Sequence, residues 1–179
     1  MTRADPHVVL RPAVLEDAEL LAALARDAFD HAFGHLYKPE DLAAFFAQYK
    51  TVEKYQAAID NPDIRIQLAE LDGKPAAYAL LVRNERFAQH PAPQPQRPLM
   101  LSQLYCAGYA TGMGLGAALM DWVMAEARDW RADAITLSVY SENFGAQRFY
   151  QRYGFRHVAD IDFWVGNHRD DEYLYELLL

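Results

Sequence analysis

The stretch Thr111-Gly112-Met113-Gly114-Leu115-Gly116 decides the fold, because it forms a turn that joins a strand to a helix. Residues 101–106 before it read as a strand, and residues 117–130 after it carry apolar side chains at helical spacing. Three alternating glycines at the start of a helix leave backbone N–H groups free at the positive end of the helix dipole. Such a turn binds a phosphate or a diphosphate without a lysine or arginine.

Two other glycine-rich phosphate sites fit this stretch less well. A nucleotide P-loop needs a lysine directly after its last glycine, and Gly116 is followed by two alanines. Residues 112–117 formally match the dinucleotide motif G-x-G-x-x-G/A, with Asp133 about 20 residues further on. That acid should follow the next strand, however, and here it precedes the strand at 134–140. Residues 107–111 also separate the first strand from the glycines, which argues against a dinucleotide turn.

The composition predicts one folded domain that spans residues 1–179. Hydrophobic residues make up 52% of the chain, and no run of about 18 apolar residues that would predict a membrane span occurs. The N-terminus has no apolar segment of signal-peptide type, and the single cysteine, Cys106, is typical of the reducing cytoplasm. A net charge of −8 argues against nucleic acid as a partner. It is compatible with a cationic substrate, or with solubility alone.

The remaining elements predict a mixed α/β sheet without internal repeats. Polar Asp170, Asp171 and Glu172 are interpreted as part of a loop between the last two strands. Asp72-Gly73 is a hairpin turn signal. The expected strands are 7–11, 64–71, 76–82, 101–106, 134–140, 158–165 and 173–178, and the expected helices are 15–29, 39–49, 52–59, 117–130 and one after residue 143.

A second motif follows the helix and the strand behind the glycine turn. Asn143, Ala146 and the run Phe149-Tyr150-Gln151-Arg152-Tyr153-Gly154-Phe155 match N-x-x-A-x-x-F-Y-x-x-x-G-F. With the turn, this pattern resembles the GCN5-related N-acetyltransferase (GNAT) superfamily, whose turn reads [QR]-x-x-G-x-[GA]; Thr111 stands where that family has Gln or Arg. The resemblance implies a mixed, mostly antiparallel sheet of about seven strands. It also implies a splay between strands 4 and 5, with about four flanking helices.

Looser patterns extend the resemblance to both ends of the chain. Residues 163–166 and 171–177 are similar to the C-terminal strands of bacterial spermidine/spermine-type N-acetyltransferases. Residues 28–33 with Pro39-Glu40 resemble their first helical region.

The resemblance implies that acetyl-CoA binds between the two motifs, with its diphosphate on the glycine turn and its pantetheine arm along residues 104–106. The implied binding residues are Leu104, Tyr105, Cys106, Thr111, Gly112, Met113, Gly114, Leu115, Gly116, Ala117, Asn143, Ala146, Phe149 and Tyr150. Asn143 serves equally well as a helix N-cap.

Three groups are candidates for the chemistry of acetyl transfer. The Cys106 N–H is the candidate donor to the thioester oxygen, a type of contact worth about 3 kcal/mol. Tyr150 is the candidate general acid, because a phenol with a pKa near 10 is protonated at neutral pH; packing is its alternative role. Ser102, Glu142 or a chain of water molecules remain open as the route for the proton of the amine.

The sequence therefore predicts an acetyl-CoA-dependent N-acetyltransferase in which a primary amine attacks directly. Expected acceptors are polyamines, then amino sugars, amino acids and protein amines, and a homodimer is expected at the family level only. The alternative is a CoA-binding regulatory module without turnover. We expect no metal, because His31 and His35 lack a third ligand nearby.

Overall fold

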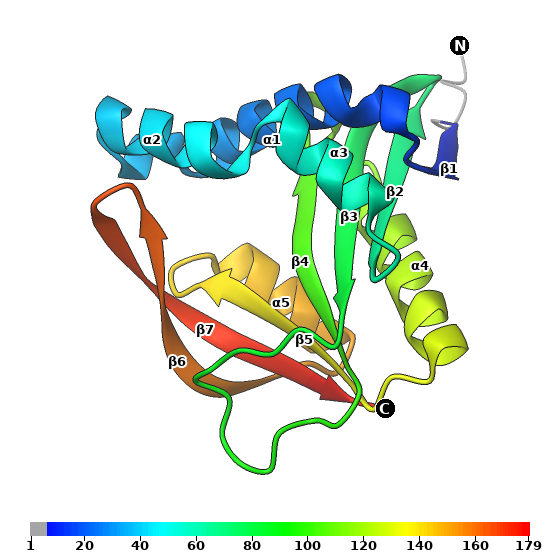
Figure 1. The fold of residues 1–179 in the computed structure, drawn as a ribbon, viewed down its shortest axis with the longest axis vertical. Coiled ribbons are helices and arrows are strands. Elements are labelled where there is room, and N and C mark those ends of the chain that lie inside the picture. The colour runs from blue at the N-terminus through cyan, green and yellow to red at the C-terminus, as the bar shows by residue number, and fades with distance from the viewer. Residues whose placement is uncertain (1–6) are drawn as a thin grey trace.

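A computed structural model describes residues 7–179 of the chain as a seven-stranded sheet in the order β1-β2-β3-β4-β5-β7-β6 (Figure 1). All neighbouring strands are antiparallel except β4 and β5, which are parallel. The strands are β1 Val8–Pro12, β2 Ile64–Leu71, β3 Lys74–Arg83, β4 Pro98–Cys106, β5 Ala134–Tyr140, β6 Arg156–Val165 and β7 His168–Leu178. The sheet confirms the predicted mixed fold.

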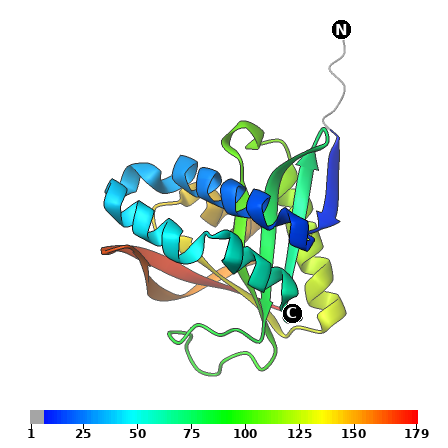
Figure 2. The same cartoon turned by 45° about the horizontal axis from the view of Figure 1, so that its top comes forward.

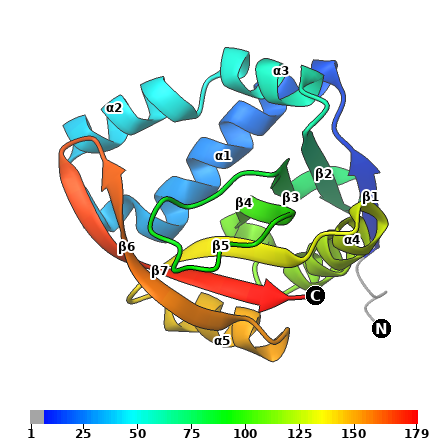
Figure 3. The same cartoon turned by 60° about the horizontal axis from the view of Figure 1, so that its bottom comes forward.

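Helices cover both faces of the sheet (Figures 2 and 3). They are α1 Ala18–Phe33, α2 Pro39–Tyr49, α3 Val52–Asp60, α4 Leu115–Trp130 and α5 Phe144–Arg152. Helices α1, α2 and α3 lie on one face, and α4 and α5 lie on the other. None of the helices in residues 7–179 is long and apolar enough to span a membrane.

The core has a separate apolar cluster under each group of helices. Helix α4 presents Leu115, Leu119 and Val123 to one face, where they pack with the buried Tyr150 of α5. On the other face, α1 and α3 pack against β2 and β3 through residues such as Leu21 and Tyr55. A third cluster joins α1, α2 and the end of β6. Each helix is therefore fixed to the sheet by its own apolar stripe.

The predicted splay between β4 and β5 is confirmed. The two strands are in register only at Pro98–Ala134, Leu99–Ile135 and Met100–Thr136. Beyond Met100, β4 stays paired with β3 while β5 pairs with β7, so the strands diverge (Figure 1). One edge of β4 is therefore left without a neighbouring strand in the middle of the sheet.

One predicted loop is wrong. Asp170, Asp171 and Glu172 belong to β7, which starts at His168, and only Gly166 and Asn167 separate it from β6. These polar residues look like a loop in the sequence because they interrupt the apolar pattern of a strand. In the structure Asp170 is buried, and its Oδ2 accepts a hydrogen bond from the Tyr37 hydroxyl at 2.5 Å.

Candidate active site

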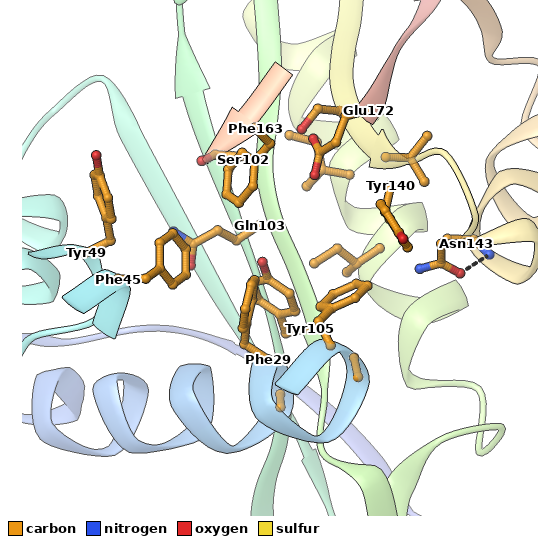
Figure 4. Close-up of a pocket in the computed structure, with 18 of the residues that line it drawn as sticks. Phe29, Phe45, Tyr49, Ser102, Gln103, Tyr105, Tyr140, Asn143, Phe163 and Glu172 are labelled. Atoms are coloured by element: carbon orange, nitrogen blue, oxygen red, sulfur yellow. Dashed lines mark hydrogen bonds between the residues drawn. The ribbon is translucent and has the colours of Figure 1, made fainter. Parts of the chain in front are cut away.

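A cavity of about 570 Å³ lies in the opening between β4 and β5 (Figure 4). The two strands form its floor, helices α1 and α2 border one side, and α5, β6 and β7 border the other. The predicted residues Ser102, Leu104, Tyr105, Cys106, Asn143, Ala146 and Tyr150 all line it. The structure thus brings the strand motif and the α5 motif to one space.

The backbone of β4 offers hydrogen-bonding groups to this space. The Ala107 N–H donates to the Ala76 carbonyl at 2.7 Å, which fixes the alternation of the β3–β4 ladder. Since alternate residues of an antiparallel strand bond to opposite sides, the N–H and C=O groups of Leu104 and Cys106 face away from β3. These are the two residues expected to pair with an extended pantetheine arm. Tyr105 between them bonds toward β3 and packs its ring near Phe29, with 6.1 Å between ring centroids.

A β-bulge in β4 places Ser102 at the cavity. Leu80 faces Gln103 and Leu81 faces Leu101, so Ser102 is the extra residue without a partner in β3. Bulges of this kind occur beside active sites, where they redirect a side chain. Ser102 is exposed, whereas Glu142 is not among the residues that line the cavity.

The glycine turn exposes backbone N–H groups at the start of α4. The first bond within the helix runs from the Ala118 N–H to the Gly114 carbonyl at 3.0 Å, so the N–H groups of residues 115–117 have no partner within the helix. Gly112 and Gly114 have φ of 79° and 85°, and a Cβ on either would meet nothing within 4 Å. The turn is therefore open to a ligand.

The turn lies outside the cavity but next to it. The predicted residues Thr111, Gly112, Met113, Gly114, Leu115, Gly116, Ala117 and Phe149 do not line the cavity. A Cβ on Gly116 would lie 3.9 Å from Cζ of Phe149, so α5 borders the start of α4. The Thr111 hydroxyl donates to the Ala107 carbonyl at 3.4 Å, which ties the turn to the end of β4.

Helix α5 contributes a cap and a buried phenol. The Asn143 Oδ1 accepts a hydrogen bond from the Ala146 N–H at 3.1 Å, so Asn143 is the N-cap of α5 while it also lines the cavity. Tyr150 is 9% exposed, and its burial raises the pKa of the phenol well above its ordinary value. No hydrogen bond joins its hydroxyl to any residue in the range 7–179, although the hydroxyl is not among the fully enclosed polar atoms. The proton on Tyr150 is thus retained at neutral pH.

Glu172 of β7 is a functional candidate that the sequence interpretation missed. It lines the cavity opposite Phe29 and Tyr105 (Figure 4), and its Oε2 is enclosed without a hydrogen-bond partner. Burial raises the pKa of this carboxyl to about 7; Asp170 adds to the rise and the Ser138 hydroxyl opposes it. The signal that could have revealed Glu172 is the alternation in residues 171–177, where it faces the same side of the strand as Leu174.

Residues 7–179 contain no group of three His, Cys, Asp or Glu side chains placed to hold a metal ion. His31 packs against Gly108, so close that a Cβ on this glycine would meet the imidazole at 2.7 Å.

Comparison with known proteins assigns the family. Residues 24–155 match the family described as Acetyltransferase (GNAT) family. The chain belongs to the GNAT family. An uncharacterised N-acetyltransferase of Mycobacterium tuberculosis is 32% identical over 160 residues, which cover 89% of this chain and 96% of the relative. One of Lactobacillus delbrueckii subsp. lactis, in the pepI 3′ region, is 26% identical over 159 residues, covering 89% and 90%.

Two solved structures share the fold. The PaiA N-acetyltransferase of Thermoplasma acidophilum, solved with coenzyme A, superimposes with a TM-score of 0.77 at 20% identity, over 97% of this chain and 99% of that one. NAA60 of Arabidopsis thaliana, solved with a bisubstrate analogue, gives 0.72 at 18% identity, over 96% and 98%. This protein is an acetyltransferase, and acetyl-CoA is the donor that its family uses.

Proposed function

We propose that this acetyltransferase moves the acetyl group of acetyl-CoA to a primary amine of a small molecule by direct attack, without an acyl-enzyme. The observation that carries the proposal is that two features line the opening between β4 and β5 and a third lies next to it. They are the unpaired edge of β4, the free N–H groups at the start of α4, and the Tyr150 side chain.

The donor fits this opening as an added strand beside β4. The backbone groups of Leu104 and Cys106 would pair with the pantetheine amides. Of the predicted residues 112–117, Met113 already donates its N–H to the Ala110 carbonyl at 3.3 Å, so the N–H groups of residues 115–117 would hold the diphosphate at the positive end of the α4 dipole. Thr111 and Met113 would flank the diphosphate, and Phe149, which lies beside Gly116, would border it. The Cys106 N–H would donate to the thioester oxygen as negative charge develops on it.

Two groups would move protons during the transfer. The amine nitrogen bonds to the carbonyl carbon, and the bond from this carbon to sulfur breaks. Tyr150 donates its proton to the departing thiolate, because a buried phenol is still protonated when the sulfur becomes basic. Before the attack, Glu172 accepts one proton from the ammonium, directly or through water, which frees the lone pair of the nitrogen. The second proton that the nitrogen loses as the amide forms returns to Tyr150, which has given its own to the sulfur. A carboxyl with a pKa of about 7 is half ionised at neutral pH and is a stronger base than an ordinary glutamate.

Glu172 takes the place of the weaker candidates for the base. Ser102 has no basic group at neutral pH, and the Glu142 Oε2 contacts the Tyr140 hydroxyl at 3.4 Å outside the cavity lining. Ser102 would instead bind water or the acceptor at the bulge.

The resemblance to spermidine/spermine-type enzymes puts polyamines first in an acceptor screen, followed by amino sugars, amino acids and protein amines. A cytoplasmic location, which the single Cys106 favours, and a homodimer complete the proposal. Light scattering of the purified protein tests the dimer.

The Tyr150→Phe variant tests the function, with Tyr153→Phe at the end of the same helix as its matched control. We expect turnover to fall at least tenfold in Tyr150→Phe while acetyl-CoA affinity is retained, and to be nearly unchanged in Tyr153→Phe. Unchanged turnover in Tyr150→Phe would remove the general-acid role. If acetyl-CoA binds tightly but no amine in the screen causes CoA release, the protein is a CoA-binding regulatory module instead.

A further inference from the structure

Lys50, which follows α2 directly, is a buried cation without an anionic partner. It is 3% exposed, and it is the only basic residue among those that line the cavity. Within residues 7–179, no salt bridge involves its ammonium group, and the one side-chain hydrogen bond to Lys50 reaches its carbonyl. The ammonium is not among the fully enclosed polar atoms, so it is open to the cavity. A buried charge is usually paired, because removing an ion from water costs several kcal/mol.

The surroundings of this ammonium are aromatic. Its Nζ lies 5.0 Å from the centroid of the Tyr105 ring and 5.8 Å from that of Phe45, which are cation–π distances. Burial lowers the pKa of Lys50 to about 8, so the group is still mostly charged at neutral pH. Aromatic faces stabilise such a charge only in part, and they leave its N–H donors free.

Lys50 also lies on the acceptor side of the cavity. Phe45 and Tyr49 of α2 stand on one side of the space in Figure 4, and Tyr140 and Asn143 stand on the other. The position of α2 is fixed there, because the Asp41 Oδ1 accepts a hydrogen bond from the Asn167 N–H at 2.8 Å. The α4 turn that would hold the diphosphate is on the opposite face of the sheet, so Lys50 is free for the other substrate.

We propose that Lys50 binds a carboxylate of the acceptor, which makes the acceptor a small amino carboxylate with apolar or aromatic surface. This inference rests on the proposed acetyl transfer. The amine of the acceptor lies toward Glu172 and Tyr150, and its carboxylate lies toward Lys50. One ammonium matches one carboxylate, and the walls of Phe29, Phe45 and Phe163 match an apolar body. A polyamine, which the family resemblance alone puts first in the acceptor screen, would bring a second ammonium to Lys50 and be repelled, so this inference expects spermidine to be a poor acceptor.

Paired acceptors that differ only in the carboxylate test the inference. The pairs are phenylalanine with phenethylamine, tyrosine with tyramine, and 4-(aminomethyl)benzoate with benzylamine. In 4-(aminomethyl)benzoate the carboxylate lies further from the amine than in the two amino acids. Spermidine is added to the panel. We expect kcat/KM of the wild-type enzyme to be about 10- to 100-fold higher for the carboxylate member of at least one pair. This factor corresponds to the usual contribution of one hydrogen bond to a charged group.

The Lys50→Met variant should remove this preference, so that its kcat/KM values for the two members of each pair become similar. Lys54→Met, which removes an exposed charge from α3, is the matched control and should behave as the wild type. Binding of 3-phenylpropionate to the CoA-loaded enzyme, measured by calorimetry, reports the anion site without turnover. Its affinity should fall at least tenfold in Lys50→Met.

Two results would overturn the inference: wild-type enzyme that uses both members of every pair equally, or 3-phenylpropionate affinity that does not depend on Lys50. The first needs no variant, so it holds even if Lys50→Met does not fold. If 3-phenylpropionate binds through Lys50 but no acceptor is acetylated, the anion site stands and the proposed acetyl transfer fails.

Discussion

Glu172→Gln makes a prediction about stability that does not depend on activity. The carboxyl has a pKa of about 7 in the folded protein against an ordinary value of 4.5, mainly because it is buried. Below pH 4.5 it is protonated in both the folded and the unfolded chain. As the pH rises toward 7, the unfolded chain releases the proton first, so folding becomes less favourable. The free energy of unfolding therefore falls as the pH rises from 4.5 to about 7, and above pH 7 this carboxyl causes no further change with pH.

The size of this effect follows from the two pKa values. Each pH unit corresponds to 1.36 kcal/mol, so charging the carboxyl costs up to roughly 3 kcal/mol of folding free energy. The glutamine variant has no charge at any pH. We therefore expect Glu172→Gln to match the wild type near pH 4.5 and to exceed its free energy of unfolding by up to roughly 3 kcal/mol at pH 8.5.

Urea unfolding of both proteins at the two pH values measures the difference. Glu85→Gln, in the exposed loop after β3, is the control and should show the same difference at both pH values. In the enzyme assay, kcat/KM of the wild type should rise with pH and level off above about 7. Glu172→Gln should lose this pH dependence and be about 100-fold or more slower. A stability difference that does not change with pH, or a variant with full activity, would refute the role of Glu172.

Three other variants test the donor site and the buried cation. Gly114→Ala places a side chain at φ 85°, which should lower the free energy of unfolding by about 1 kcal/mol or more and weaken acetyl-CoA binding. Its control is Gly73→Ala in the β2–β3 hairpin, at φ 79°, which should lose similar stability without affecting binding. Urea unfolding measures the stability and calorimetry measures the binding. Asn143→Ala should lower the unfolding free energy by about 1 kcal/mol, because the cap on the Ala146 N–H is lost; equal urea midpoints would contradict this. Lys50→Met should be up to roughly 3 kcal/mol more stable than the wild type below pH 8. This gain should shrink between pH 8 and 10.5, because the folded lysine is then neutral while the unfolded lysine is still charged, and it should be absent above 10.5. A gain that persists at about pH 11 in urea unfolding would contradict this.

The glycine turn and the cap of α5 could be predicted because they are encoded locally. Gly112 and Gly114 can adopt the positive φ that the turn into α4 needs, which other residues rarely adopt. The N-x-x-A and F-Y spacing of α5 places a cap and an inward-facing phenol within two turns. The splay between β4 and β5 was predicted from the family resemblance, and no pattern within the strands indicated it. The strands in the structure begin or end a few residues away from the predicted positions, because apolar periodicity does not fix where strand pairing stops.

The acceptor side could not be predicted, because no short segment encodes it. Lys50 follows an ordinary amphipathic helix, and nothing nearby in the sequence indicates that its ammonium is buried. It becomes buried only when α2 packs against the β6–β7 turn, and Gly166 allows that approach: a Cβ there would lie 2.5 Å from Cα of Asp41. Glu172 likewise resembles a loop residue until β7 pairs with β5, at Tyr140. If the proposed roles of Lys50 and Glu172 hold, acceptor choice depends on long-range contacts between elements, and the glycine turn and the α5 motif do not indicate which amine is acetylated.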